Sequence, residues 1–110
     1  MIDIGGKQRP IHGNINGLIE LKKDHGIDIV NGFSKESFSF EVIRSLVFVA
    51  LKYGHRKEYP TVAFEVTLDD VGDWITPANM TVVMEKVMEV FIGGVEAKEG
   101  TPTGERPGVQ

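Results

Sequence analysis

The stretch FEVIRSLVFVALKY, residues 40–53, contains ten apolar residues among fourteen. At 100° per residue its polar members fall within one narrow stripe of a helix: Glu41, Arg44, Ser45 and Lys52. The pattern therefore predicts a central helix that runs to Tyr53, or further if Gly54 does not end it, and buries every face except this stripe. Ser39 is expected to cap its N-terminus, because a serine side chain can accept a hydrogen bond from a free N–H of the first turn.

Phe48 lies in the middle of this polar stripe, between Arg44 and Lys52. A phenylalanine that stays fully exposed forgoes about 1.5–3 kcal/mol of burial free energy. Two explanations follow: either the N-terminal hairpin described below covers Phe48, or Phe48 anchors a partner. We predict a partner-binding surface formed by Phe48, Arg44 and Lys52.

The first residues of the chain have the pattern of a β-hairpin. Residues 2–4 and 7–11 flank Gly5-Gly6, and a glycine pair can take the positive φ angles of a tight two-residue turn. Pro10 cannot donate a ladder hydrogen bond, so the second strand lies at an edge or ends there.

A short helix is predicted from about Ile15. Asn14 or Asn16 would cap it, basic residues stand in its last turn, and Gly26 is suited to the left-handed residue that ends a helix. Residues 27–39 are expected to form a connection that is attached to the core by four apolar residues: Ile27, Ile29, Val30 and Phe33.

The second half of the chain predicts two more helices. Thr67 and the acids after it are typical of a capped helix start, and Thr76-Pro77 repeats the signal, because proline suits the first helical turn. Residues 61–66 alternate as a strand would, but a strand is not favoured there. The last helix places six apolar residues on one face: Met80, Val83, Met84, Val87, Met88 and Phe91. Gly93-Gly94 would end it.

Together these elements predict a mainly α fold, a small domain of about four helices with a short N-terminal hairpin. The domain would span residues 1–96. Residues 97–110, rich in Gly, Pro, Thr and charge, have too little to bury and are expected to form a flexible, disordered tail.

Composition excludes several classes of protein. The chain has no cysteine, which excludes disulfides, thiolate catalysis and cysteine-rich zinc sites. A net charge of −4 disfavours nucleic acid as the main partner. The longest apolar run, Leu46–Leu51, is far shorter than the about 20 residues of a membrane-spanning helix, and the N-terminus does not have the pattern of a secretory signal. We expect a cytoplasmic protein that does not bind membranes.

No motif in the sequence indicates catalysis, a metal or a cofactor. The three histidines, at 12, 25 and 55, stand in separate segments. Three aspartates, at 69, 70 and 73, lack the spacing of a calcium loop and suit the start of a helix better. Gly5-Gly6-Lys7 opens no helix and so is not a phosphate-binding loop. We therefore expect a protein that is not an enzyme and that has no catalytic, metal-binding or cofactor-binding residues.

Met80, Met84 and Met88 form a line at i+4 spacing on the last helix. Flexible thioethers can form an adaptable binding surface, although methionines on the apolar face of a helix more often fill a core. We predict the three methionines as a second contact region beside Phe48.

Three segments of the chain resemble, in order, the tail assembly chaperones of long-tailed bacteriophages. IDIGGKQRP, residues 2–10, is similar to the opening hairpin of that family. Residues 39–54 look like its central apolar helix, and TLDDVGDWI, residues 67–75, is similar to its Asp-Trp helix. Residues 12–15 depart from the aromatic-containing pattern of the family.

The resemblance implies a small, mainly helical protein of a phage or prophage that is made in the host bacterial cytoplasm. Such a chaperone binds the tape measure protein, recruits tail tube subunits during tail morphogenesis, and is absent from the mature virion. The family often produces a longer form by ribosomal frameshifting, in which residues 97–110 would serve as a linker.

Two other classes of protein fit the same sequence pattern. One is a structural head–tail connector or tail completion protein, which would also be small, helical and non-catalytic. The other is a regulator that binds DNA through residues 67–92, which the acidic residues there disfavour. An exposed Phe48 could equally be buried in a homo-oligomer.

Overall fold

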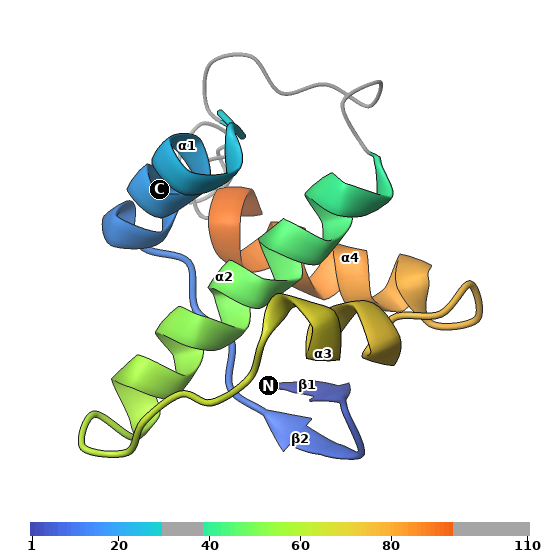
Figure 1. The fold of residues 1–110 in the computed structure, drawn as a ribbon, viewed down its shortest axis with the longest axis horizontal. Coiled ribbons are helices and arrows are strands. Elements are labelled where there is room, and N and C mark those ends of the chain that lie inside the picture. The colour runs from blue at the N-terminus through green and yellow to red at the C-terminus, as the bar shows by residue number, and fades with distance from the viewer. Residues whose placement is uncertain (30–38, 94–110) are drawn as a thin grey trace, which may run out of the picture.

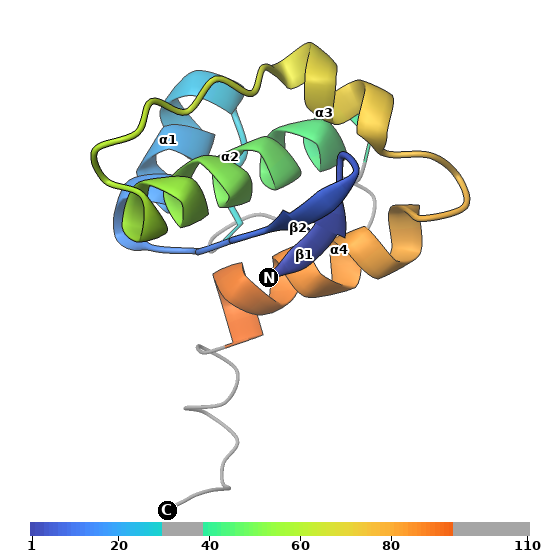
Figure 2. The same cartoon turned by 90° about the horizontal axis from the view of Figure 1, so that it is seen from below.

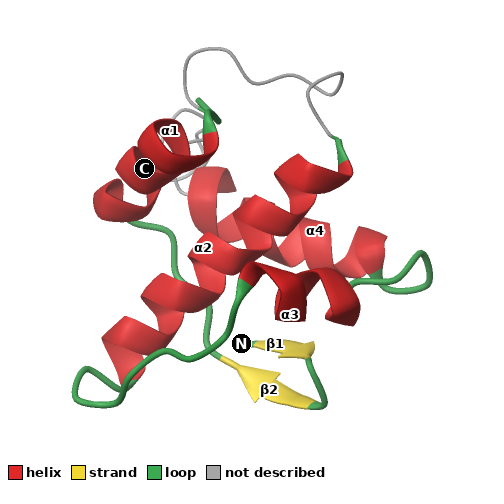
Figure 3. Cartoon of the chain, in the orientation of Figure 1, coloured by secondary structure: helices red, strands yellow, loops and turns green. Residues whose placement is uncertain are grey.

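Helix α2 (Phe40–Glu58) runs through the middle of the molecule, and the other elements pack around it (Figure 1). The computed structural model describes residues 1–29 and 39–93. These residues form β1 (Ile2–Ile4), β2 (Lys7–Arg9), α1 (Ile15–His25), α3 (Leu68–Trp74), α4 (Met80–Met88) and a final π-helical turn, η2 (Glu89–Gly93). The predicted mainly α fold with four helices and an N-terminal hairpin is confirmed (Figure 3). Val30, Phe33 and the predicted tail lie outside the described residues.

The two strands pair antiparallel, with Ile2 opposite Arg9 and Ile4 opposite Lys7. Gly5 and Gly6 form the turn, with φ angles of 64° and 83°. Such left-handed backbone is costly for residues with a Cβ, which explains the glycine pair. The second strand ends before Pro10, shorter than the predicted 7–11. Ile2 and Ile4 point into the core, whereas Asp3 between them is exposed.

Helix α1 has the predicted caps. Oδ1 of Asn14 accepts a hydrogen bond from the Gly17 N–H at 2.7 Å. Gly26, with a φ of 69°, ends the helix, and the N–H of Ile27 donates back to the Leu21 carbonyl at 2.9 Å. Ile27 and Ile29 are buried, as predicted.

Helix α2 does not end at Gly54 but continues to Glu58. Ser39 caps it, with Oγ accepting from the Val42 N–H at 3.2 Å. The middle of the helix is covered on all sides by α1, α3, α4 and β2. Figure 2 shows α3 and α4 on opposite sides of its N-terminal half. Its core residues are therefore almost entirely buried: Leu46, Val47, Val49, Ala50 and Leu51.

The segment after β2 lies directly on the backbone of α2. A Cβ on Gly54 would come within 2.2 Å of the Pro10 carbonyl oxygen, and the His12 N–H donates to the Ala50 carbonyl at 3.1 Å. On its other side the same segment touches η2, where a Cβ on Gly13 would lie 2.2 Å from the Val90 carbonyl oxygen. Small residues at these positions thus let residues 10–13 pass between α2 and η2.

The prediction that the polar stripe of α2 is exposed to solvent is wrong for most of its residues. Ser45 is buried, and Arg44 and Lys52 are half-buried. The reason is that α1 and α3 both pack on α2. In contrast Phe40, expected on a buried face, is 78% exposed in the first turn.

The connection between α2 and α3 contains no strand at 61–66, in agreement with the sequence prediction. It is held against the end of α2 by side chains. The His55 ring nitrogen Nε2 lies 2.9 Å from the Val62 carbonyl oxygen, and the His55 ring centroid lies 5.4 Å from that of Phe64.

Helix α3 starts as predicted, with a capping box in which Thr67 and Asp70 exchange side-chain to backbone hydrogen bonds of 3.0 Å. The predicted start of the last helix at Thr76-Pro77 is wrong. These residues form a turn, which Asn79 Oδ1 closes by accepting from the Thr76 N–H at 2.8 Å, and α4 begins at Met80. Val83, Val87 and Phe91 are buried on the predicted apolar face.

Trp74, at the end of α3, joins that helix to the hairpin. Its ring lies against Gly5, where a Cβ would come within 2.7 Å of the ring atoms. The Arg9 guanidinium lies 4.4 Å from the centre of the Trp74 ring, and Arg9 Nε also donates to the Ile4 carbonyl at 3.0 Å. The hairpin turn therefore needs glycine for both its φ angle and the contact with Trp74.

We expect Gly54→Ala to destabilise the protein by about 2–3 kcal/mol, because the new methyl group would push Pro10 off α2. Elsewhere in a helix, glycine to alanine stabilises by up to about 1 kcal/mol. The matched control is Gly72→Ala in α3, where the nearest neighbour is the flexible Arg44 side chain. Urea unfolding followed by circular dichroism measures both, and a Gly54→Ala protein as stable as wild type would contradict the close approach.

We expect Gly5→Ala to lower the free energy of unfolding more than Gly6→Ala. Both substitutions cost about 1–2 kcal/mol, because both φ angles are positive. Only the methyl group at position 5 would also meet Trp74, since no atom lies within 4 Å of a Cβ at Gly6. Thermal unfolding compares the two variants, and tryptophan fluorescence should shift in Gly5→Ala alone. Equal losses would show that Trp74 does not lie on the turn.

Candidate functional site

Phe48, the predicted centre of the partner-binding surface, is half-buried in the structure. Its ring centroid lies 6.4 Å from that of His25 at the end of α1 and 5.8 Å from that of Phe64 in the connection to α3. These rings, rather than the hairpin, provide its aromatic neighbours. Phe48 thus belongs to an aromatic cluster that joins α1, α2 and the α2–α3 connection.

Lys52, the second predicted contact residue, pairs with Glu20 of α1. Its Nζ lies 2.9 Å from Glu20 Oε1, and the Tyr53 hydroxyl donates to the same oxygen at 2.9 Å. Burial raises the pKa of the Glu20 carboxyl, but these two hydrogen bonds together with the positive charges of Lys52 and His25 outweigh burial and hold the pKa below its ordinary value. Burial and the bond to Glu20 raise the pKa of the Tyr53 hydroxyl. This network attaches α1 to α2.

Arg44, the third predicted residue, is half-buried one turn before Phe48. Its side chain lies next to α3, because a Cβ on Gly72 would be 3.3 Å from Arg44 Cδ. The Nε atom is buried and has no hydrogen-bond partner among the described residues. Arg44 therefore differs from Lys52, whose charge is paired.

Arg44 lines an apolar hollow, a groove of about 510 Å³ between α2, α3 and α4. We call it the α2–α3–α4 groove. Its lining consists of Phe40, Glu41, Ile43, Arg44, Gly72, Ile75, Thr76, Pro77 and Met80. The groove is apolar over most of its lining, with Glu41 and Arg44 as its two charged residues.

The structure brings together only two of the six predicted contact residues. Arg44 and Met80 share the groove, whereas Phe48 and Lys52 lie further along α2 and are not part of its lining. Met84 and Met88 are half-buried against the core and also lie outside the groove. The predicted line of three methionines is thus divided between the groove and the core.

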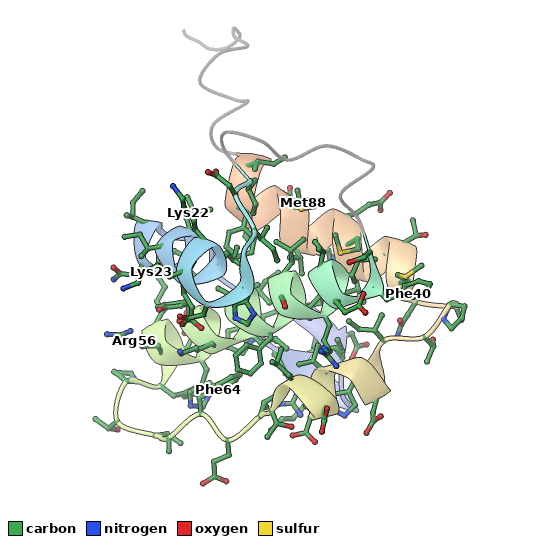
Figure 4. The ribbon with its side chains drawn as sticks, turned by 45° about the horizontal axis from the view of Figure 1, so that its top comes forward. Lys22, Lys23, Phe40, Arg56, Phe64 and Met88 are labelled. Atoms are coloured by element: carbon green, nitrogen blue, oxygen red, sulfur yellow. The ribbon has the colours of Figure 1, made fainter. Side chains whose placement is uncertain are left out.

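Sequence reasoning missed the groove residue Phe40. Its side chain points away from the body of the molecule at the N-terminal end of α2 (Figure 4). Its position directly after the capping Ser39 was a usable signal, because a residue in the first turn has no preceding turn of helix to pack against. Ile75 and Pro77 were also missed, because Ile75 was expected among the apolar residues of the helix 67–75 and Pro77 in the first turn of the last helix.

Two of the three histidines belong to one row of aromatic rings, in which His25 contacts Phe48, Phe48 contacts Phe64 and Phe64 contacts His55. His12 is bonded to α2 through its backbone N–H. Within residues 1–29 and 39–93, no group of three His, Asp or Glu residues could hold a metal ion. None of the helices in these ranges is long and apolar enough to cross a membrane.

Comparison of the chain with protein-family models, with curated proteins and with solved structures finds no match.

We expect Glu20→Gln to lower the free energy of unfolding by about 1–2 kcal/mol at neutral pH, because it weakens the bonds from Lys52 and Tyr53. The folded protein holds the pKa of Glu20 below its unfolded value of 4.5. The stabilisation is therefore present above that value and is lost as the pH falls through the folded pKa.

Urea unfolding between neutral and acidic pH tests this expectation. The difference between wild type and Glu20→Gln should shrink as the pH falls below 4.5. Glu65→Gln, which removes the same charge from an exposed position, is the matched control. A difference between wild type and Glu20→Gln that does not change with pH would show that the paired carboxylate is not its source.

Proposed function

We propose that this protein is a tail assembly chaperone of a long-tailed bacteriophage or prophage. It binds the tape measure protein and recruits tail tube subunits during tail morphogenesis, without catalysing a reaction and without a cofactor. It acts in the host bacterial cytoplasm and is absent from the mature virion. Neither nucleic acid nor membrane is needed for this role.

The observation that carries the proposal is the α2–α3–α4 groove. A chaperone that keeps a long helical protein soluble needs accessible apolar anchors on a frame that does not collapse onto them. Phe40 is such an anchor, since 78% of its surface is exposed. The groove beside it is lined by apolar side chains from α2, from α4 and from the connection between α3 and α4, and by the backbone of Gly72 in α3, so a partner side chain would lose contact with water on several sides.

The positions of the three segments that resemble the family add support. The hairpin segment and the Asp-Trp helix meet where Gly5 and Arg9 lie on Trp74. Both pack on the central helix, through the contacts of Pro10 with Gly54 and of α3 with α2. The three segments thus form one packed frame, as expected if they are the structural signature of one family.

The groove also revises the contact surface within this proposal. Phe40, Arg44 and Met80 are proposed to contact the tape measure protein. Phe48 and Lys52 hold the frame through His25, Phe64 and Glu20.

The alternative is a structural head–tail connector or tail completion protein. Such a protein would use the same kind of apolar surface but would remain in the particle. Mass spectrometry of purified virions separates the two, because the chaperone should be missing from them.

The proposal predicts a long coiled-coil tape measure gene close to this one, and co-expression of the two genes tests it. We expect the tape measure protein to be soluble and to co-purify with the wild-type chain. Phe40→Ser should reduce co-purification strongly, because it removes an exposed apolar anchor from the groove.

The matched control is Val62→Ser, which removes another exposed apolar side chain, 58% accessible, outside the groove. This variant should behave as wild type. Loss of the tape measure protein from the wild-type pull-down would contradict the proposed function, and equal losses in both variants would exclude the groove as the contact surface.

A further inference from the structure

The α2–α3–α4 groove combines an apolar lining with one cation, Arg44, that has no salt bridge within residues 1–29 and 39–93. We propose that it binds a partner segment that places an Asp or Glu side chain on Arg44, between apolar anchors that fill the groove. The inference deepens the proposed function and rests on it for the assumption that the groove is a protein-binding surface. What it adds is the chemistry of the segment that binds.

Arg44 supplies the charge that selects a carboxylate. An arginine side chain stays positively charged in proteins and carries five N–H donors. Its Nε is buried without a hydrogen-bond partner among the described residues, and a buried donor without an acceptor costs free energy. Arg44 lines the groove and is only half-buried, so a carboxylate that enters the groove can accept from the terminal nitrogens of its guanidinium, which makes a carboxylate the natural partner.

Glu41 is the one carboxylate that shares the groove. It stands three residues before Arg44 on α2 but is exposed, and within the described residues it forms no salt bridge with Arg44. An exposed pair would in any case contribute little. A partner carboxylate that enters the groove is desolvated together with Arg44 and therefore gains more from the contact.

The lining determines what must carry the carboxylate. Ile43, Ile75 and Met80 line the groove together with Arg44 and offer no hydrogen bonds from their side chains, so a small hydrated anion would gain little there. A protein segment can bring an acidic residue with aliphatic or aromatic neighbours on both sides. Such neighbours can contact the apolar side chains that line the groove, among them Phe40, Pro77 and Met80.

Room for this contact depends on Gly72. The Arg44 side chain passes within van der Waals distance of the Gly72 backbone, and a Cβ there would come to 3.3 Å from Arg44 Cδ. Glycine in the middle of a short helix costs up to about 1 kcal/mol. A glycine at position 72 leaves space beside α3 for the Arg44 side chain, which lines the groove.

Selection from a library of random peptides, displayed inside a scaffold loop so that no free chain end is offered, tests the inference on the full-length protein. We expect the selected peptides to combine an Asp or Glu with aliphatic or aromatic residues. Replacing that acid by its amide should weaken binding about tenfold, as should Arg44→Gln. With Arg44→Gln, the change of peptide acid to amide should have no further effect.

Three further variants make the result specific. Phe40→Ser should also weaken binding, and it removes a side chain too exposed to be needed for folding. Glu41→Gln should leave binding unchanged or strengthen it, since it removes a competing carboxylate. Lys23→Gln removes a cation on the other side of the molecule (Figure 4) and should have no effect.

Peptides that lack a carboxylate, peptides that bind Arg44→Gln as well as wild type, or a library without any groove-binding peptide would each overturn the inference. Failure of the proposed function is distinguishable. In that case acidic peptides still bind through Arg44, but the tape measure protein does not co-purify. Conversely, a tape measure protein that binds Arg44→Gln as well as wild type would leave the function in place and exclude the carboxylate contact.

Discussion

The structure depends on one close approach between two backbones, where residues 10–13 lie on α2 at Ala50 and Gly54. The His12 N–H bonds to the Ala50 carbonyl, and the Pro10 carbonyl lies where a side chain at position 54 would begin. This contact fixes the hairpin on one side of α2 and delivers the chain to the start of α1 on the other. Because α2 touches almost every other element, an error in this position would displace the hairpin and α1 together.

Trp74 provides the second constraint, since it holds the end of α3 to the turn of the hairpin through Gly5 and Arg9. The residues most characteristic of the family resemblance are therefore the residues that build the frame. Such residues can suggest a family because a frame requires particular side chains at particular places. They say little about where a partner binds, because the binding surface is formed by residues that the frame leaves uncovered.

Local signals in the sequence predicted the helix ends well. Asn14, Ser39 and Thr67 each accept the hydrogen bond expected of a cap. The exposure of α2 was predicted poorly, because a helical wheel assumes one buried side, whereas α1 and α3 pack on both sides of the polar stripe. Long basic side chains tolerate this, since their alkyl parts can be covered while their charged ends reach a partner or water. Periodicity alone cannot reveal such packing, because it depends on which helices become neighbours.

Arg44 and Lys52 were predicted to belong to the same partner-binding surface, but the structure gives them different surroundings. They stand four residues before and four residues after Phe48, so the sequence makes them equivalent flanks of one surface. In the structure Lys52 is paired with Glu20 from α1, whereas α3 brings a glycine rather than an acid to Arg44. Among residues 1–29 and 39–93, the same stripe therefore holds a paired cation at Lys52 and a cation without a salt bridge at Arg44. The proposed partner contact lies at this second position, because there the charge adjoins the apolar lining of the groove at the N-terminal end of α2.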